Sequence, residues 1–141
     1  MSKLFFRVTR PLIVARPAET QATLQQLGTL VQNSDPEVRA QSLRSIVQWD
    51  KTGQVAEGAV YQALSDAHPD VRTAALAEIN NNPIRSDRIK SALLGMIANV
   101  NESADVKADA LNVLQRFPLS QAEYASYHQA REQLASGGEA E

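Results

Sequence analysis

The chain has 141 residues, of which 43% are hydrophobic and 21% charged, so it is long enough for one domain with its own core. Its net charge of −2 gives no reason to expect a nucleic-acid partner, and the absence of cysteine excludes disulfides, thiol catalysis and cysteine-based zinc sites. Aromatic residues make up only 5%, and alanine and leucine supply most of the apolar material. This composition favours packed helices over a sheet.

The N-terminal segment, residues 1–17, is basic and apolar. Residues 1–18 carry Lys and Arg without any acid, and two apolar runs occupy residues 4–6 and 12–14. Pro11 and Pro17 oppose one continuous helix, and no run of the sequence is long enough to span a membrane. We expect this segment to cover the start of the domain as a cap, or to dock on a partner or an anionic surface. A disordered or processed leader is the remaining alternative.

Three later segments of the chain repeat one pattern, aligned on Val38, Val71 and Val106, which are 33 and 35 residues apart. In each copy an acid precedes the valine, a base follows it, leucine comes five residues later and an aliphatic residue eight later. The matching residues are Glu37, Arg39, Leu43 and Ile46; Asp70, Arg72, Leu76 and Ile79; Asp105, Lys107, Leu111 and Leu114. Such spacing forms one stripe on an α-helix, so each copy is predicted to be a helix with a single buried face.

A second amphipathic stretch lies ahead of each copy, at residues 20–32, 54–65 and 87–100. Short breakers separate these stretches, so the predicted unit is helix, turn, helix, in repeats at about 20–49, 54–82 and 87–117. Asp35 is a good N-cap, and Pro36 suits the first helical position. A further helix is expected at residues 120–135, with Ser120 and Glu123 as a capping box. The predicted domain is therefore residues 18–135, followed by a disordered tail at 136–141.

The run D-P-x-V-R, followed by small, leucine and aliphatic positions, resembles the second helix of a bacterial HEAT-like repeat. The resemblance covers residues 20–117 and implies an all-α, right-handed α-α superhelix of about three helix pairs plus a C-terminal capping helix. First helices would lie on the convex side and second helices on the concave side. Because the family serves mostly as a protein-binding scaffold, it implies a non-enzymatic interaction or adaptor module. The alternatives are a HEAT-like enzyme, such as a phycobilin lyase or an alkylpurine DNA glycosylase, and a structural subunit anchored through its N-terminus.

The basic residues that follow the three valines, Arg39, Arg72 and Lys107, form a column beside the buried stripe. We expect a structural charge ladder in which this column lies near the acids that precede the valines. Those acids are Glu37, Asp70 and Asp105. A phosphate- or DNA-binding row is the alternative interpretation, but it would need more basic residues on the inner face.

The inner face of the predicted superhelix consists of small, mildly polar and nearly neutral residues, which suit a protein or peptide partner better than a polyanion. Plain solvent exposure of this face is the alternative. Trp49, at the end of the first repeat, is either a binding residue or a core residue at a helix end. The candidate partner-binding residues are Ala40, Gln41, Arg44, Trp49, Thr73, Ala77, Asp109 and Asn112.

No catalytic constellation is visible in the sequence. The two histidines, His68 and His128, lie far apart, and His68 fits a turn or N-cap position before Pro69. No nucleophile with a positioned base and no glycine-rich phosphate loop occurs, so we expect no catalytic residue, metal or cofactor. The expected partner is a protein or peptide of unknown identity, bound by a monomer or within a hetero-complex. The compartment is not fixed by the sequence, although the cytoplasm is preferred to the periplasm.

Overall fold

The computed structural model describes residues 17–50 and 53–139, and this part of the chain contains seven helices and no strand. The helices are α1 (Pro17–Leu30), α2 (Pro36–Trp49), α3 (Gln54–Ala63), α4 (Pro69–Asn81), α5 (Asp87–Ala98), α6 (Ala104–Leu114) and α7 (Gln121–Glu139). The predicted all-α fold is confirmed. None of the described helices is long and apolar enough to cross a membrane.

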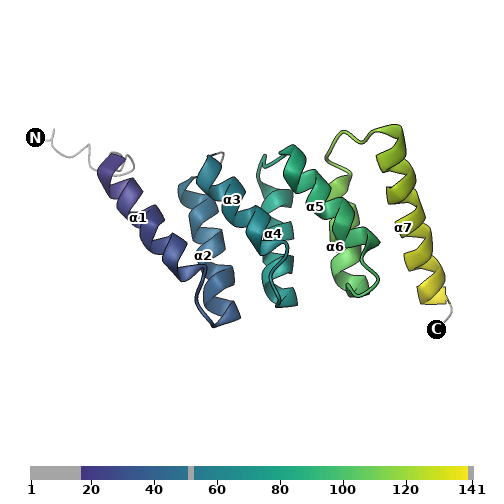
Figure 1. The fold of residues 1–141 in the computed structure, drawn as a ribbon, viewed down its shortest axis with the longest axis horizontal. Coiled ribbons are helices and arrows are strands. Elements are labelled where there is room, and N and C mark those ends of the chain that lie inside the picture. The colour runs from purple at the N-terminus through teal and green to yellow at the C-terminus, as the bar shows by residue number, and fades with distance from the viewer. Residues whose placement is uncertain (1–16, 51–52, 140–141) are drawn as a thin grey trace, which may run out of the picture.

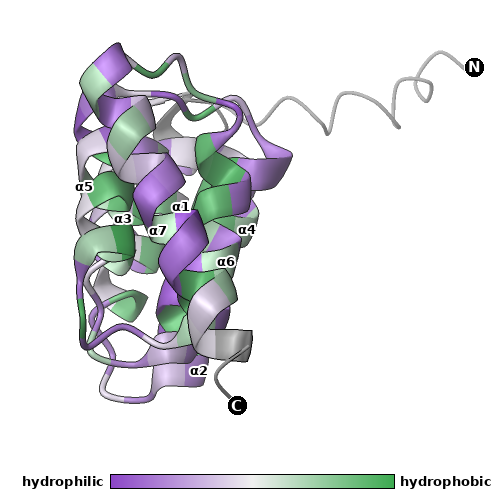
Figure 2. Cartoon of the chain, turned by 90° about the vertical axis from the view of Figure 1, so that its right-hand side faces the viewer, coloured by the Kyte–Doolittle hydropathy of each residue, from purple (hydrophilic) through white to green (hydrophobic). Residues whose placement is uncertain are grey.

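The helices follow one another along the long axis of the molecule in the order of the chain (Figure 1). They form three antiparallel pairs, α1–α2, α3–α4 and α5–α6, and α7 packs on both α5 and α6. Viewed from the α7 end, α3 and α5 lie on one side and α4 and α6 on the other (Figure 2). We call α3 and α5 the first-helix layer, and α2, α4 and α6 the second-helix layer. Helices α1 and α7 cover the two ends of the stack.

The second helices begin where the sequence predicted, because each start is capped. Asp35 Oδ1 accepts a hydrogen bond from the Glu37 N–H at 2.9 Å, and Pro36 opens α2. His68 Nδ1 accepts from the Asp70 N–H at 3.1 Å, which confirms the N-cap interpretation of this histidine. The predicted capping box of the last helix is also present, since Ser120 N–H donates to Glu123 Oε1 at 2.8 Å and Glu123 N–H to Ser120 Oγ at 3.1 Å.

The core is one continuous cluster that runs through the whole stack. It contains the leucine and aliphatic positions of the repeated stripe, together with the buried faces of α3 and α5. Contacts between α2 and α4 and between α4 and α6 are more extensive than those between α3 and α5. The second-helix layer is therefore the more closely packed of the two.

Two predicted boundaries differ from the structure. Helix α1 starts at Pro17, earlier than predicted, and α7 continues to Glu139, so the first part of the predicted disordered tail is helical. No proline follows the expected end of α7, and a glycine weakens a helix without ending it. The cap or docking role predicted for residues 1–17 falls outside the described residues except for Pro17.

Candidate functional site

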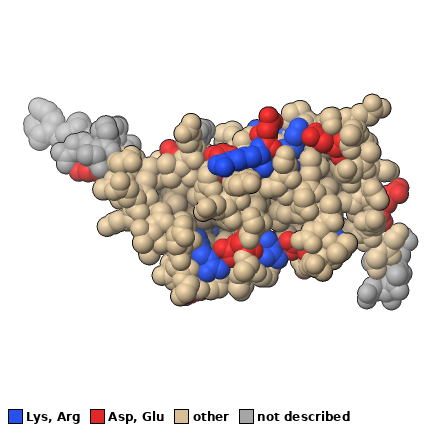
Figure 3. All heavy atoms as spheres, in the orientation of Figure 1, with Lys and Arg blue, Asp and Glu red and all other residues tan. Residues whose placement is uncertain are grey.

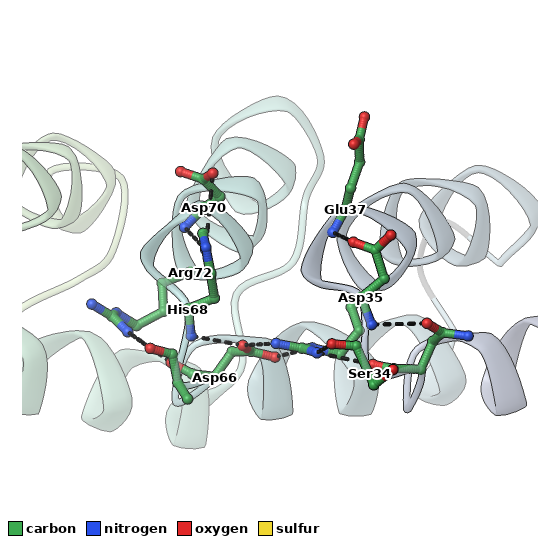
Figure 4. Close-up of polar contacts among 10 residues, drawn as sticks. Ser34, Asp35, Glu37, Asp66, His68, Asp70 and Arg72 are labelled. Carbon is green, nitrogen blue, oxygen red and sulfur yellow. Dashed lines mark hydrogen bonds and ion pairs between the residues drawn. The ribbon is translucent and has the colours of Figure 1, made fainter.

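A row of ion pairs joins the turns that precede the second helices. Arg39 Nε and Nη2 donate to the two carboxylate oxygens of Asp66 at 2.8 and 2.7 Å. Its Nη1 donates to the carbonyls of Asn33 and Ser34, in the turn ahead of its own helix, at 2.9 and 3.1 Å. One guanidinium therefore holds together the α1–α2 turn and the α3–α4 turn (Figure 4).

The next helix pair repeats this arrangement. Arg72 Nη1 donates to the carbonyl of Asp66 at 2.7 Å, and Nη2 donates to Glu102 Oε2 at 2.8 Å. The Glu102 side chain is only 4% exposed and also accepts from the Ser103 N–H. The row thus runs through all three helix pairs and can be followed along the lower edge of the molecule in Figure 3.

Arg39 and Arg72 link the helix pairs, as the charge-ladder prediction expects. The acids predicted as their partners, Glu37, Asp70 and Asp105, were wrong. Within the described residues, none of the three predicted acids pairs with the basic column. Glu37 and Asp70 point away from the row in Figure 4. An acid two residues ahead of a base lies about 200° around the helix from it, so the two side chains cannot meet. Lys107, the last member of the column, makes no ion pair with any described residue.

The Arg39–Asp66 pair of this row is partly buried, and its two members shift each other's ionisation. The Arg39 guanidinium, through its hydrogen bonds, lowers the pKa of the Asp66 carboxyl, while burial opposes the shift. The same bond raises the pKa of Arg39. Both side chains are less than one fifth exposed, 18% for Arg39 and 14% for Asp66. These charges are therefore engaged in holding the stack and are not available as a docking row for an anion.

A second row of ion pairs lies along the opposite edge, between the first helices and α7 (Figure 3). Arg88 Nη2 and Nε donate to Glu57 at 2.6 and 2.8 Å, and the Arg88 guanidinium lies 4.4 Å from the ring centre of Tyr61. Lys90 pairs with Glu123 at 3.0 Å. These bonds join α3 to α5 and α5 to α7.

The Glu57 pair makes stability depend on pH. Its hydrogen bond with Arg88 lowers the pKa of Glu57 from 4.5 to about 2. Because the folded-state pKa is the lower one, the stabilisation is present above the ordinary pKa and is lost as the pH falls towards about 2. We expect Glu57→Gln to cost at most about 1 kcal/mol at neutral pH, since the pair is partly solvated, and nothing in strong acid. Urea unfolding across this pH range measures the difference, with Glu37→Gln as the control. A pH-independent cost would contradict this assignment.

The second-helix layer carries two adjoining grooves on its outer face. The groove between α2 and α4 has a volume of about 670 Å³, and the groove between α4 and α6 about 220 Å³. Thr73 and Ala77 line both of them. The first groove contains Asp35, Pro36, Glu37, Ala40, Gln41, Arg44, His68, Asp70, Thr73, Ala74 and Ala77. The second contains Thr73, Leu76, Ala77, Asn80, Asp109, Asn112 and Val113. Every predicted inner-face residue except Trp49 therefore lies in one groove or the other.

The predicted exposure of Ala40 was wrong. Ala40 is buried, as is Ala74, because α2 and α4 pack so closely that these two positions form the floor of the groove between them. The remaining predicted residues of the face are exposed, and they are Gln41, Arg44, Thr73, Ala77, Asp109 and Asn112. Ala40 consequently shapes the groove through its small size and offers no exposed side chain to a partner.

Four polar side chains of these grooves have no hydrogen-bond partner among the described residues. The side chains of Gln41, Thr73, Asp109 and Asn112 make no hydrogen bond with any described residue. Grooves of about 520 and 530 Å³ also lie on the first-helix side, but their walls contain the Arg39–Asp66 and Arg72–Glu102 pairs, which are already engaged. The grooves on the first-helix side are therefore crossed by ion pairs that the stack itself uses, although the side chains of Gln62 and Asn101 in them also make no hydrogen bond with a described residue.

The groove between α2 and α4 is acidic. The prediction of a nearly neutral inner face is therefore wrong for this groove. Its lining holds the carboxylates of Asp35, Glu37 and Asp70 against the single cation Arg44. These acids occupy the caps and first turns of α2 and α4, so helix pairing gathers them at one end of the groove. Near the other end, burial raises the pKa of Glu78, while the charge of Arg44 acts against the shift.

Trp49 lies outside both grooves at the end of α2, and 46% of its surface is exposed, so the core interpretation of this residue was wrong.

No group of three metal-ligating side chains occurs in the described part of the chain. His128 contacts Glu132 on its own helix at 3.2 Å. A comparison with protein-family models, with curated proteins and with solved structures found no match.

Proposed function

We propose that this chain is a non-enzymatic protein-binding module that holds an extended, basic segment of a partner protein along its second-helix layer. The observation that carries the proposal is the pair of adjoining grooves across α2, α4 and α6, in which the exposed side chains of Gln41, Thr73, Asp109 and Asn112 make no hydrogen bond with a described residue. Polar groups of this kind are available to pair with a peptide backbone, whose N–H and C=O groups both need partners when they are desolvated.

The shape of the grooves suits an extended chain. Ala40, Ala74 and Ala77 lie on the floor and wall between α2 and α4, where larger side chains would keep a peptide backbone away. The amides of Gln41 and Asn112 can each donate and accept, and Thr73 lies where the two grooves meet. A single extended segment that crosses α4 would reach all three of these side chains.

The charge of the first groove favours a basic segment. Glu37 and Asp70 are exposed and form no ion pair with a basic side chain among the described residues, apart from the weak contact of Asp70 with His68 at 3.8 Å. Lysine or arginine side chains of a partner would therefore find two free carboxylates at the α2–α4 end of the face. Complementary charge of this kind accelerates association and fixes the direction of the bound segment.

Neutralising these two carboxylates is expected to weaken partner binding. The double substitution Glu37→Gln, Asp70→Asn should reduce affinity roughly fivefold, since each exposed pair contributes about 0.5 kcal/mol. The partner is first captured on the immobilised wild-type chain, and its affinity for each variant is then measured at low and high salt. Asp105→Asn is the matched control, because this exposed acid occupies the same helix position in α6 but lies outside both grooves. Equal affinities for the double variant and the wild type would contradict a basic ligand.

A steric variant tests the surface independently of charge. Thr73→Arg fills the junction of the two grooves and should abolish capture, whereas Gln62→Arg, in the groove between α1 and α3, should leave it intact. Both positions are exposed, so neither substitution is expected to disturb the core. The opposite pattern, with binding lost only in Gln62→Arg, would move the partner to the first-helix side.

A further inference from the structure

The face formed by the two grooves of the second-helix layer continues beyond α6. A third groove, of about 340 Å³, lies between α6 and α7, and Asn112 lines both this groove and the one between α4 and α6. Asn112 thus joins the second groove to the third, as Thr73 joins the first to the second. The three grooves follow one another from α2 to α7 along the long axis of the molecule (Figure 1).

The groove between α6 and α7, called the α6–α7 groove below, contains an apolar recess. Leu111 and Tyr127 in its lining are each 5% exposed, and Leu134 is half-buried. A hydrogen bond joins its two walls, because Gln115 Nε2 donates to the Tyr127 hydroxyl at 3.0 Å. A recess of this kind suits one aliphatic or aromatic side chain, which gains free energy by leaving water.

The charge of this face changes sign between its two ends. The groove between α2 and α4 is acidic, whereas Arg131 is the single charged side chain among the described residues that line the α6–α7 groove. Arg131 is exposed, and it forms no ion pair with any of the described residues. Its guanidinium lies 5.9 Å from the ring centre of Tyr127, beside the apolar recess. One end of the face therefore attracts bases, and the other end attracts acids.

We propose that the partner segment carries an apolar residue beside an acidic residue, about six residues away from its basic end, and that both bind in the α6–α7 groove. This inference rests on the proposed function of the second-helix layer. The centres of the two outer grooves are two helix spacings apart, roughly 20 Å, which six extended residues span. The apolar side chain fills the recess beside Tyr127, and the carboxylate pairs with Arg131. Opposite charges at the two ends fix the direction of the bound segment.

Selection from a random peptide library displayed on phage, with the full-length chain immobilised, tests this charge order. Peptides enriched on the wild type should carry Lys or Arg at one end and an apolar residue with Asp or Glu about six residues away. Arg131→Glu should weaken their binding about fivefold, because an attraction becomes a repulsion. A fresh selection on this variant should keep the basic end and lose the acid. Lys107→Glu is the matched control and should change neither result, since Lys107 lies on α6 outside all three grooves.

Thr73→Arg separates a failure of this inference from a failure of the proposed function. Peptides that no longer bind Thr73→Arg, but bind Arg131→Glu as tightly as the wild type, would keep the binding face and exclude the α6–α7 groove from it. Enriched peptides without an acidic residue would overturn the inference in the same way. Peptides that bind Thr73→Arg normally, or no enrichment on the wild type, would contradict the proposed function and this inference together.

The fold of each variant is checked by circular dichroism. Arg131 is exposed, so its substitution is expected to leave the helices intact. If Arg131→Glu unfolds, Arg131→Gln decides the question, because it removes the charge without reversing it and should weaken the enriched peptides about twofold. Unchanged affinity for a folded Arg131→Gln chain would then overturn the inference.

Discussion

Replacing Leu76 with alanine is expected to lower the free energy of unfolding by about 3 kcal/mol, the usual cost of removing a fully buried leucine from a packed core. Leu76 is 1% exposed and lies on α4, the helix that packs on α2, α3 and α6 at once. A cavity here removes contacts shared by all three helix pairs. Urea unfolding followed by circular dichroism measures the loss.

Leu30→Ala is the matched control for this substitution. Leu30 ends α1 and is 41% exposed, so the same change should cost less than about 1 kcal/mol. Comparable losses at the two positions would show that burial within the stack does not determine stability, contrary to the continuous core described above. A loss at Leu76 that leaves part of the helix content intact would show that the three pairs unfold separately.

Replacing Asp66 with alanine is expected to cost about 2 kcal/mol, because the part-buried Arg39 guanidinium then loses its charged partner. Asp66 accepts two hydrogen bonds from Arg39 and a third from the His68 N–H at 2.9 Å, which fixes the start of α4. Arg39→Met, and the double variant with Asp66→Ala, complete a cycle that isolates the pairwise energy. A coupling near zero would mean that the Arg39–Asp66 ion pair contributes nothing to the stability of the stack.

The Arg39–Asp66 pair also predicts how the free energy of unfolding changes with pH. Since the pKa of Asp66 is lower in the folded state than its ordinary value of 3.8, its stabilisation is present above that value and is lost as the pH falls below it. The difference between wild type and Asp66→Ala should therefore shrink in acid. Asp70→Ala is the control, because the Asp70 side chain is exposed and its carboxylate receives no hydrogen bond from Arg39.

The second helices were predictable from the sequence because several local signals agree. The repeated stripe, the caps Asp35 and His68 and the prolines after them all place a helix start at the same point. Such signals depend on neighbouring residues only, so they predict α2, α4 and α6 closely. The role of Arg39 and Arg72 in joining the pairs was also predictable, because the basic residue lies beside the buried stripe.

Features that depend on how helices pack on one another were not predictable in this way. The partners of the arginines, Asp66 and Glu102, lie in turns one helix pair further along the chain, and only the stacking brings them within reach. A signal did exist, since both acids stand just ahead of the second helix in their own repeat. The burial of Ala40 likewise follows from the close approach of α2 and α4 and not from its place on one helix.

The acidity of the groove between α2 and α4 could not be predicted from the sequence for a similar reason. The sequence places Glu37 and Asp70 in the predicted charge ladder, so the predicted inner face without them is nearly neutral. In the structure they face outward beside Asp35 and add their charges to the groove. The resemblance to HEAT-like repeats and the handedness of the stack stay predictions, and so does the concave position of the second-helix layer.

Site-specific photo-crosslinking in the cell tests the binding face most directly. A photoreactive phenylalanine analogue is placed at Thr73, in the junction of the second-helix grooves, or at Gln62, on the first-helix side. Both positions are exposed and lie on helices. We predict a covalent adduct with a partner protein from position 73 and none from position 62, with the adduct reduced by Glu37→Gln and Asp70→Asn. An adduct formed only from position 62 would contradict the proposal that the second-helix layer binds the partner.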